Sequence, residues 1–152
     1  MQYTEGKVGR AFLLRLEHGE PLPEAVERFA ASRGVMAAAV LIVGGVDAGS
    51  KLVVGPEKRE DMPPRPMLAI LSGVHEFAGV GIIAPDEHGR PRLHMHGAAG
   101  RGASTSTGCV RLGIRTWQVL EVLIVELSGL NAARLPDEQT GFSLLRCESE
   151  ES

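Results

Sequence analysis

Pro91–Arg101 reads PRLHMHGAAGR and carries the strongest local signal in the chain. It follows a hairpin-type turn at Asp86–Gly89, so we expect residues 90–98 to form the return strand of a hairpin. Side chains two residues apart on a strand point to the same face, so His94 and His96 would present two imidazoles side by side. Such a pair can chelate one metal ion. The alternative is that one ring hydrogen-bonds a backbone carbonyl while the other faces water.

Further strands are expected on both sides of this hairpin. Apolar or alternating runs predict them at residues 8–16, 36–43, 51–54, 67–73, 77–84, 109–112, 116–127 and 140–147. The 116–127 segment also fits helical spacing, but its β-branched residues favour a strand. One helix is expected over residues 21–33 and closed by Gly34. We expect Gly44-Gly45 to end the second long strand and the Gly/Ser/Thr-rich residues 100–108 to form a loop.

The length and composition indicate one domain with an α/β (α+β) fold. The chain has 152 residues, of which 43% are hydrophobic, which argues against global disorder. We expect a core over residues 7–147, an antiparallel-rich sheet with one main packed helix, and an acidic tail at 148–152. Residues 55–66 are rich in charge and proline and predict an exposed loop, with a lid over a site as the alternative.

The charge balance bears on the class of partner. With 16 basic and 19 acidic residues the formal net charge is −3, and a nucleic-acid-binding surface usually shows a basic excess. No uncharged apolar run approaches the roughly 18 residues of a membrane-spanning helix. The N-terminal residues lack the pattern of a signal peptide, and two cysteines do not form a disulfide framework. We therefore expect a cytoplasmic protein that binds no membrane.

Cys109 is the candidate third metal ligand. It lies thirteen residues after His96, beyond a Gly-rich stretch that could return the chain beside the histidine strand. A thiolate and two imidazoles form a donor set that suits zinc, and three protein ligands leave a fourth position open. The alternative is that Cys109 is a small buried apolar residue. Cys147 has no histidine near it in sequence and is expected to be inert.

Glu76 and Arg101 are weaker candidates for catalytic roles. The pair His75-Glu76 could supply a fourth ligand or a general base, although a Glu facing solvent is the simpler interpretation. Arg101 lies in the Gly/Ser/Thr-rich stretch, where it could contact an anion. That stretch has no Walker-type lysine and no dinucleotide-binding fingerprint.

Several motifs together resemble the PPC (plants and prokaryotes conserved) domain family, also called domain of unknown function 296. The histidine strand Pro91–Arg101 resembles that of the family, and Arg10–Leu16 resembles its first strand. Ile70–Gly73 (ILSG) is similar to its central strand, and Thr107–Gly113 (TGCVRLG) stands where the family has a GGHLLEG-like motif. Thr116–Val125 resembles a later strand. The resemblance extends over most of the chain and matches the prokaryotic stand-alone type.

The resemblance implies a homotrimer and, in several prokaryotic members, a metal held by three histidines. Two of these match His94 and His96, whereas the third falls at Cys109. Zinc accepts a thiolate as readily as an imidazole, so the departure is compatible with a site. The family also has a DNA-binding label. A trimer of this chain would carry three times −3, or −9, and Gly89–Arg92 resembles an AT-hook core only superficially because it lies in a turn next to two acidic residues.

Three functions are weighed from the sequence, the third of them a DNA-associated protein as the family label implies. The first is a zinc-binding PPC-type protein with a regulatory or ligand-sensing role, in which a small molecule is the ligand. The second is a zinc-dependent enzyme that acts on a small molecule through a metal-bound water, with Glu76 or Arg101 assisting. The −3 balance makes autonomous DNA binding doubtful.

Overall fold

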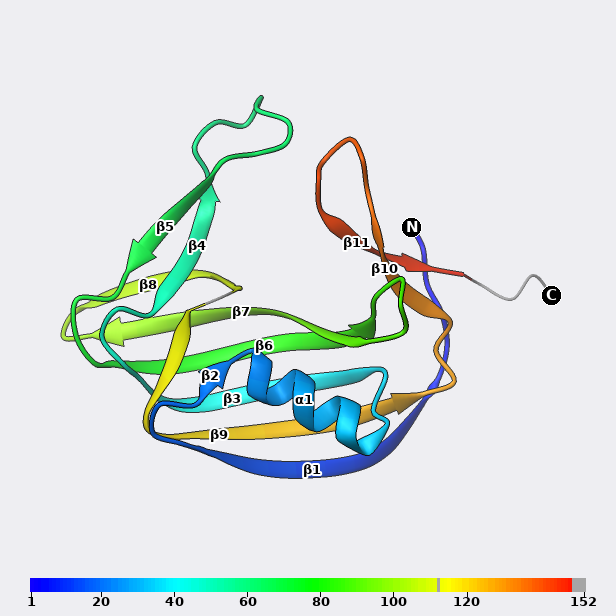
Figure 1. Ribbon diagram of the computed structural model, residues 1–152, viewed down its shortest axis with the longest axis horizontal. Helices are drawn as coiled ribbons and strands as arrows, with labels where there is room; N and C mark the ends of the chain where they lie inside the picture. Colours follow the sequence, from blue (N-terminus) through cyan, green and yellow to red (C-terminus); the bar gives the residue numbers. More distant parts are fainter. Residues whose placement is uncertain (112, 149–152) are drawn as a thin grey trace.

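Most of the chain forms β-strands joined by short turns, as Figure 1 shows for the computed structural model, which describes residues 1–111 and 113–148. The elements in chain order are β1 (Lys7–Glu17), β2 (Pro21–Leu22), α1 (Glu24–Arg33), β3 (Ala38–Val46), β4 (Lys51–Pro56), β5 (Pro66–Ile70), β6 (His75–Pro85), β7 (Pro91–Arg101), β8 (Ser104–Val110), β9 (Ile114–Ser128), β10 (Ala132–Pro136) and β11 (Ser143–Cys147). No helix among these residues is long and apolar enough to cross a membrane.

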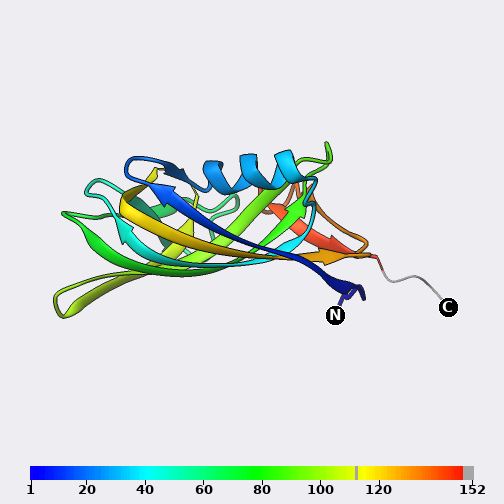
Figure 2. The same cartoon turned by 90° about the horizontal axis from the view of Figure 1, so that it is seen from below.

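The strands pair into one large antiparallel sheet in the order β1-β9-β3-β6-β7-β8-β4-β5, with β2 added beside β9. Helix α1 covers one face of this sheet, and no described element covers the opposite face (Figure 2). A second, two-stranded sheet of β10 and β11 lies at the end of β6, where Asp86 forms a bridge with Arg134. The chain is therefore a single domain with a mostly antiparallel sheet and one helix, as expected.

The core lies between α1 and the sheet because apolar residues alternate along the central strands. On β9, Leu120, Val122 and Ile124 are fully buried, whereas the neighbouring side chains are more exposed. Val26 and Ala30 of α1 belong to the same buried cluster. Burial of each large aliphatic side chain contributes roughly 1.5–3 kcal/mol. The prediction of a strand over residues 116–127 is thus confirmed.

The helix is shorter than predicted. It begins at Glu24 because Pro21 and Leu22 pair with Arg115 and Ile114 of β9 and so belong to the sheet. Its C-terminal end is as predicted, with Gly34 in the left-handed region at φ 66°. Glycine adopts this conformation without the steric cost that a Cβ imposes.

Two glycines expected to end β3 lie inside it. The strand continues through Gly44 and Gly45 to Val46, with a bulge between the two glycines where β3 pairs with β9. A Cβ on Gly44 would overlap the Val119 carbonyl oxygen, and one on Gly45 would lie 2.8 Å from the Trp117 carbonyl oxygen. The prediction was wrong because these glycines permit close approach of two backbones rather than a turn.

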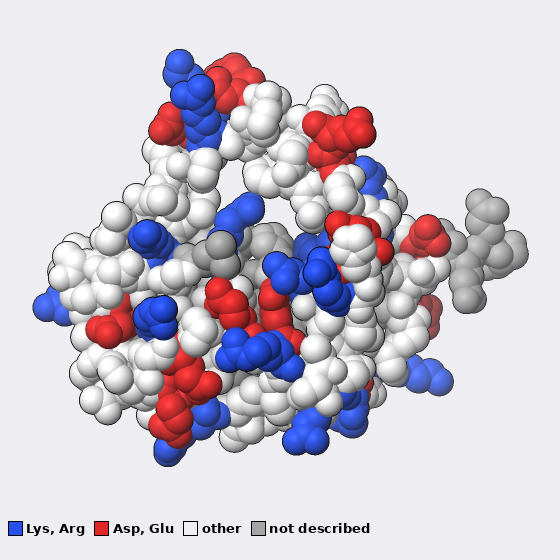
Figure 3. Space-filling model, viewed as in Figure 1, with Lys and Arg blue, Asp and Glu red and all other residues white. Residues whose placement is uncertain are grey.

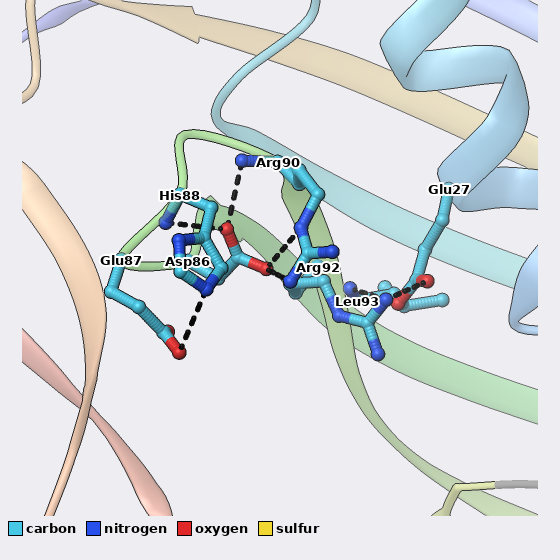
Figure 4. A network of polar contacts seen from close by, with 7 residues as sticks. All are labelled: Glu27, Asp86, Glu87, His88, Arg90, Arg92 and Leu93. Atoms are coloured by element: carbon cyan, nitrogen blue, oxygen red, sulfur yellow. Dashed lines mark hydrogen bonds and ion pairs between the residues drawn. The ribbon is translucent and has the colours of Figure 1, made fainter.

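The turn before β7 is held by the side chain of Asp86 (Figure 4). Its Oδ1 accepts hydrogen bonds from the backbone N–H groups of His88 (3.0 Å) and Arg90 (2.9 Å), and its Oδ2 accepts one from Nε of Arg90 (2.9 Å). Burial alone would raise the pKa of Asp86, but these bonds outweigh it and the pKa is lowered. The hairpin-type turn predicted at residues 86–89 is present.

Glu27 connects α1 to the first residues of β7 (Figure 4). Its carboxylate accepts a hydrogen bond from the backbone N–H of Leu93 (2.9 Å) and forms an ion pair with Nη1 of Arg92 (3.0 Å). The Glu27 side chain is only 14% exposed, so this contact is partly shielded from water. Helix and turn together fix the strand that carries His94 and His96.

Candidate metal centre

Three potential metal ligands converge on the face of the sheet opposite α1. His94 and His96 lie on β7 between the buried residues Leu93, Met95 and Gly97, so both rings point away from the core. Cys109 lies directly opposite His96 in the β7–β8 pairing. The nitrogen and sulfur donors of His94, His96 and Cys109 all lie within 4.8 Å of one another.

The β7–β8 hairpin brings Cys109 to the histidines. Residues 100–108 were expected to form a loop, but β7 continues to Arg101 and β8 begins at Ser104 after a tight turn at Gly102. That prediction was wrong because the glycines suggested a loop, whereas the alternate residues Thr105 and Thr107 favour a strand. The part of the strand predicted over 109–112 that includes Leu112 lies outside the described residues.

Glycine at position 108 allows a third strand to approach Cys109. A Cβ on Gly108 would overlap the carbonyl oxygen of Val53 on β4. Val53 is also the residue that pairs with Cys109 across β4 and β8. Cys109 is therefore enclosed between β7 and β4 and is only 8% exposed.

The three donor groups are not engaged elsewhere. The rings of His94 and His96 pack edge to face with centroids 5.2 Å apart, and neither makes a hydrogen bond to another described residue. The Cys109 thiol has only a weak contact, 3.9 Å, to the carbonyl oxygen of Val110. These contacts do not favour the alternative in which one imidazole is held by a backbone carbonyl.

The surroundings of His94 favour its neutral form. Burial is the largest cause that lowers its pKa, and electrostatic interactions with Arg134, His96 and Arg111 lower it further. The neutral imidazole is the form that binds a metal ion. The lowered pKa of His94 thus favours the form of the ring that coordinates a metal ion.

Arg134 is a residue of the site that the sequence interpretation missed. It lies on β10, a strand that was not predicted, and is 8% exposed. Its Nη2 donates a hydrogen bond to the carbonyl oxygen of Ile82 (3.4 Å), the residue opposite His94 on β6. Burial lowers the pKa of Arg134, and an electrostatic interaction with Cys109 opposes this shift. No sequence motif connects Arg134 to a histidine forty residues earlier.

Glu76 and Arg101 do not join this cluster. Glu76 lies on β6 four residues before Val80, the partner of His96, which corresponds to about 13 Å along the strand. Arg101 lies at the far end of β7, and its Nη1 donates a hydrogen bond to the carbonyl oxygen of Val74 (2.7 Å). Cys147, on β11, is a free cysteine outside the cluster.

The donor set fits a zinc ion. Tetrahedral zinc with Zn–N distances of about 2.0–2.1 Å and Zn–S of about 2.3 Å needs donors about 3.3–3.6 Å apart. The observed spacing of at most 4.8 Å reaches these values with small side-chain rotations. Three protein ligands on an exposed face would leave a fourth position for another ligand.

Comparison with known proteins agrees with the fold and bears on the site. The family model described as the Plants and Prokaryotes Conserved (PCC) domain matches residues 3–128. No curated protein matches the chain.

Solved structures with the same fold have different descriptions. A metal-containing protein from Archaeoglobus fulgidus is 27% identical, covers 95% of this chain and 98% of its own, and has a TM-score of 0.80. A plant- and prokaryote-conserved (PPC) protein from Pyrococcus horikoshii is 23% identical over the whole of both chains, with a TM-score of 0.81. A candidate DNA-binding protein from Ralstonia eutropha JMP134 is 21% identical over 90% of both chains, with a TM-score of 0.66.

Proposed function

The chain belongs to the Plants and Prokaryotes Conserved domain family, and we propose that it is a zinc-binding member in which His94, His96 and Cys109 hold the ion. The observation that carries this proposal is the convergence of two uncommitted imidazoles and a buried thiol within 4.8 Å. The metal-containing description of the Archaeoglobus fulgidus protein supports it. We infer a regulatory or ligand-sensing role in which a small molecule reaches the open position of the metal.

Metal analysis of untagged protein tests the proposal. Wild-type protein is purified, exchanged into metal-free buffer with a weak chelator, and compared with the Cys109→Ser and His94→Ala/His96→Ala variants. We expect about one zinc per chain in the wild type and little in either variant, while circular dichroism shows all three folded. A folded wild-type protein that takes up no zinc, cobalt or other divalent metal would refute the proposal.

A zinc-dependent enzyme acting on a small molecule is the second candidate. The open fourth position favours it, because zinc held by three protein ligands can activate water or polarise a carbonyl group. The positions of Glu76 and Arg101 weigh against it, since neither lies beside the three donors. An enzyme of this kind would need a carboxylate or another base within about 3 Å of the reacting water.

DNA binding receives less support. The chain carries −3, and basic and acidic side chains are interspersed on the face that carries α1 (Figure 3). A protein that binds duplex DNA through its own surface presents a continuous basic area. A gel-shift assay at low salt that shows no complex would exclude this function.

We also propose that the protein is a homotrimer that buries the bare face of the sheet. Five aliphatic side chains of β1, β3 and β6 on this face are 42–78% exposed: Leu13, Leu41, Val43, Val80 and Ile82. An exposed apolar surface of this extent is typical of an interface between subunits. Because Ile82 is opposite His94, such an interface would run beside each metal centre.

A cytoplasmic location is consistent with this centre. Cys109 and Cys147 are both free. A reducing compartment keeps a thiol available as a metal ligand. Fractionation of cells, with the zinc content of the protein measured in the recovered fraction, tests the location.

A further inference from the structure

Arg134 has a buried guanidinium group whose hydrogen-bonding capacity is mostly unused. It is 8% exposed, and its single hydrogen bond within the described chain runs from Nη2 to the carbonyl oxygen of Ile82. Its buried Nε has no partner there. No ion pair joins it to a carboxylate among the described residues. Burial of such a charge without a counterion is unfavourable, so an anion from outside the chain would be favoured here.

A second guanidinium group lies on the other side of His94. Arg111 follows Val110, the partner of Met95 across β7 and β8, so it stands beside His94 at the end of β8. It packs over the ring of Phe142, 5.2 Å from the ring centroid, and makes no ion pair with any described residue. The metal donors are therefore flanked by positive charge from Arg111, just after β8, and from Arg134 of β10.

The charge of a loaded centre would also favour an anion. A divalent ion with one thiolate and two neutral imidazoles keeps one positive charge. Arg134 and Arg111 add two more beside it. The open position would thus select a negatively charged ligand over a neutral one.

A cavity of about 310 Å³ is lined by Lys51, Val53, Leu68, Arg111 and Gly113. Val53 is the β4 residue that pairs with Cys109, which places the cavity beside the donor cluster. Its volume is at the lower end of the range for sites of small molecules. Its lining combines two basic side chains with two aliphatic ones.

We propose that the ligand of this centre is a small organic carboxylate, whose carboxylate group takes the open metal position and accepts hydrogen bonds from Arg134, while its carbon chain lies in the cavity lined by Val53 and Leu68. This inference rests on the proposed metal centre. A planar guanidinium matches a carboxylate in geometry and charge, and hydrogen bonds between charged groups are the strongest of their kind.

Cobalt-substituted protein tests this inference and the metal centre separately. Cobalt(II) gives visible d–d bands and a thiolate charge-transfer band that report on the ligands directly. The protein is titrated with butyrate, phosphate or chloride at constant ionic strength, as wild type and as the variants Arg134→Gln, Arg134→Lys and Arg111→Gln. Arg28→Gln, an exposed change on α1, is the matched control.

We expect butyrate to shift the d–d bands of the wild type at lower concentration than phosphate or chloride. Arg134→Gln should weaken butyrate about tenfold or more without changing cobalt stoichiometry, Arg134→Lys should recover part of this loss, and Arg28→Gln should have no effect. Absence of cobalt bands in the wild type would overturn the metal centre and this inference together. Three outcomes would overturn this inference alone. The bands could fail to respond to butyrate, respond equally in Arg134→Gln and Arg134→Lys, or respond more strongly to phosphate than to butyrate.

Discussion

His96 and Cys109 face each other directly across β7 and β8. Directly opposite residues of an antiparallel pair project to the same side of the sheet with Cβ atoms about 4.5–5.5 Å apart. The third donor is therefore positioned by the register of a hairpin. A shift of the β7–β8 register by one residue would turn Cys109 to the α1 face, away from the two histidines.

Replacing Cys109 should separate the role of its position from the role of its sulfur. Loss of a residue that only hydrogen-bonds a metal ligand lowers metal affinity roughly 10–100-fold. We expect Cys109→Ser to lower zinc affinity by more than this, because it removes a ligand and a neutral hydroxyl is a poor substitute. Cys109→His should retain zinc, because an imidazole at the same position completes a three-histidine set. Competition with a coloured chelator measures the affinity. Equal zinc affinity in wild type and Cys109→Ser would show that the thiol is not a ligand.

Gly108 should be intolerant of any side chain. Gly108→Ala would place a methyl group on the carbonyl oxygen of Val53, so we expect destabilisation of about 1–3 kcal/mol and displacement of Cys109. Gly100→Ala, on the same hairpin, is the control because its Cβ would meet only Oγ1 of Thr105 at 3.6 Å. Urea unfolding measures both, and a Gly108→Ala protein as stable as Gly100→Ala would contradict the close approach of β4.

Most of the fold could be predicted from the sequence because its central strands alternate or are uniformly apolar. The strand at 116–127 was resolved correctly by its β-branched residues, and Gly34 correctly marked the end of the helix. Errors occurred where glycine has more than one use. Gly44 and Gly45 allow a bulge inside a strand, and the glycines of residues 100–108 belong to a hairpin. Both glycine patterns are also typical of the end of a strand or of a loop.

The candidate site was predictable only where it is local. The spacing of His94 and His96 depends on two residues of one strand, so the sequence alone could predict their common face. Prediction of the position of Cys109 required the register of the β7–β8 hairpin to be known. Arg134 reaches the same place because β10 packs against the end of β6. The contacting residues are about fifty positions apart in the chain, and such a contact leaves no periodic pattern in the sequence.

The bare apolar face should control assembly. Leu41 and Val80 are opposite each other on β3 and β6 and are 48% and 61% exposed, so the double change Leu41→Arg/Val80→Arg should convert the proposed trimer to monomers. Met62→Arg, an exposed apolar residue in the connection between β4 and β5, should leave assembly unchanged. Light scattering after size-exclusion chromatography gives the mass. A wild type that elutes as a monomer at all concentrations would exclude the trimer.

The ion pair of Arg10 and Glu126 should give stability that depends on pH. The two side chains meet at 2.7 Å where β1 and β9 pair, and hydrogen bonds from Arg10 are the main cause that lowers the pKa of Glu126 from 4.5 to about 2. A carboxyl group with a lowered pKa stabilises the folded state above its unfolded pKa, and this contribution disappears as pH falls from 4.5 toward 2. We expect Glu126→Gln to be destabilising at pH 6 and progressively less so below pH 4.5.

In an Arg10→Met background the same change should have an effect nearly independent of pH, because the partner that lowers the pKa is absent. Urea unfolding of the four proteins across this pH range measures the difference, and a Glu126→Gln effect that is constant with pH in the wild-type background would show that the pair does not perturb this carboxyl group.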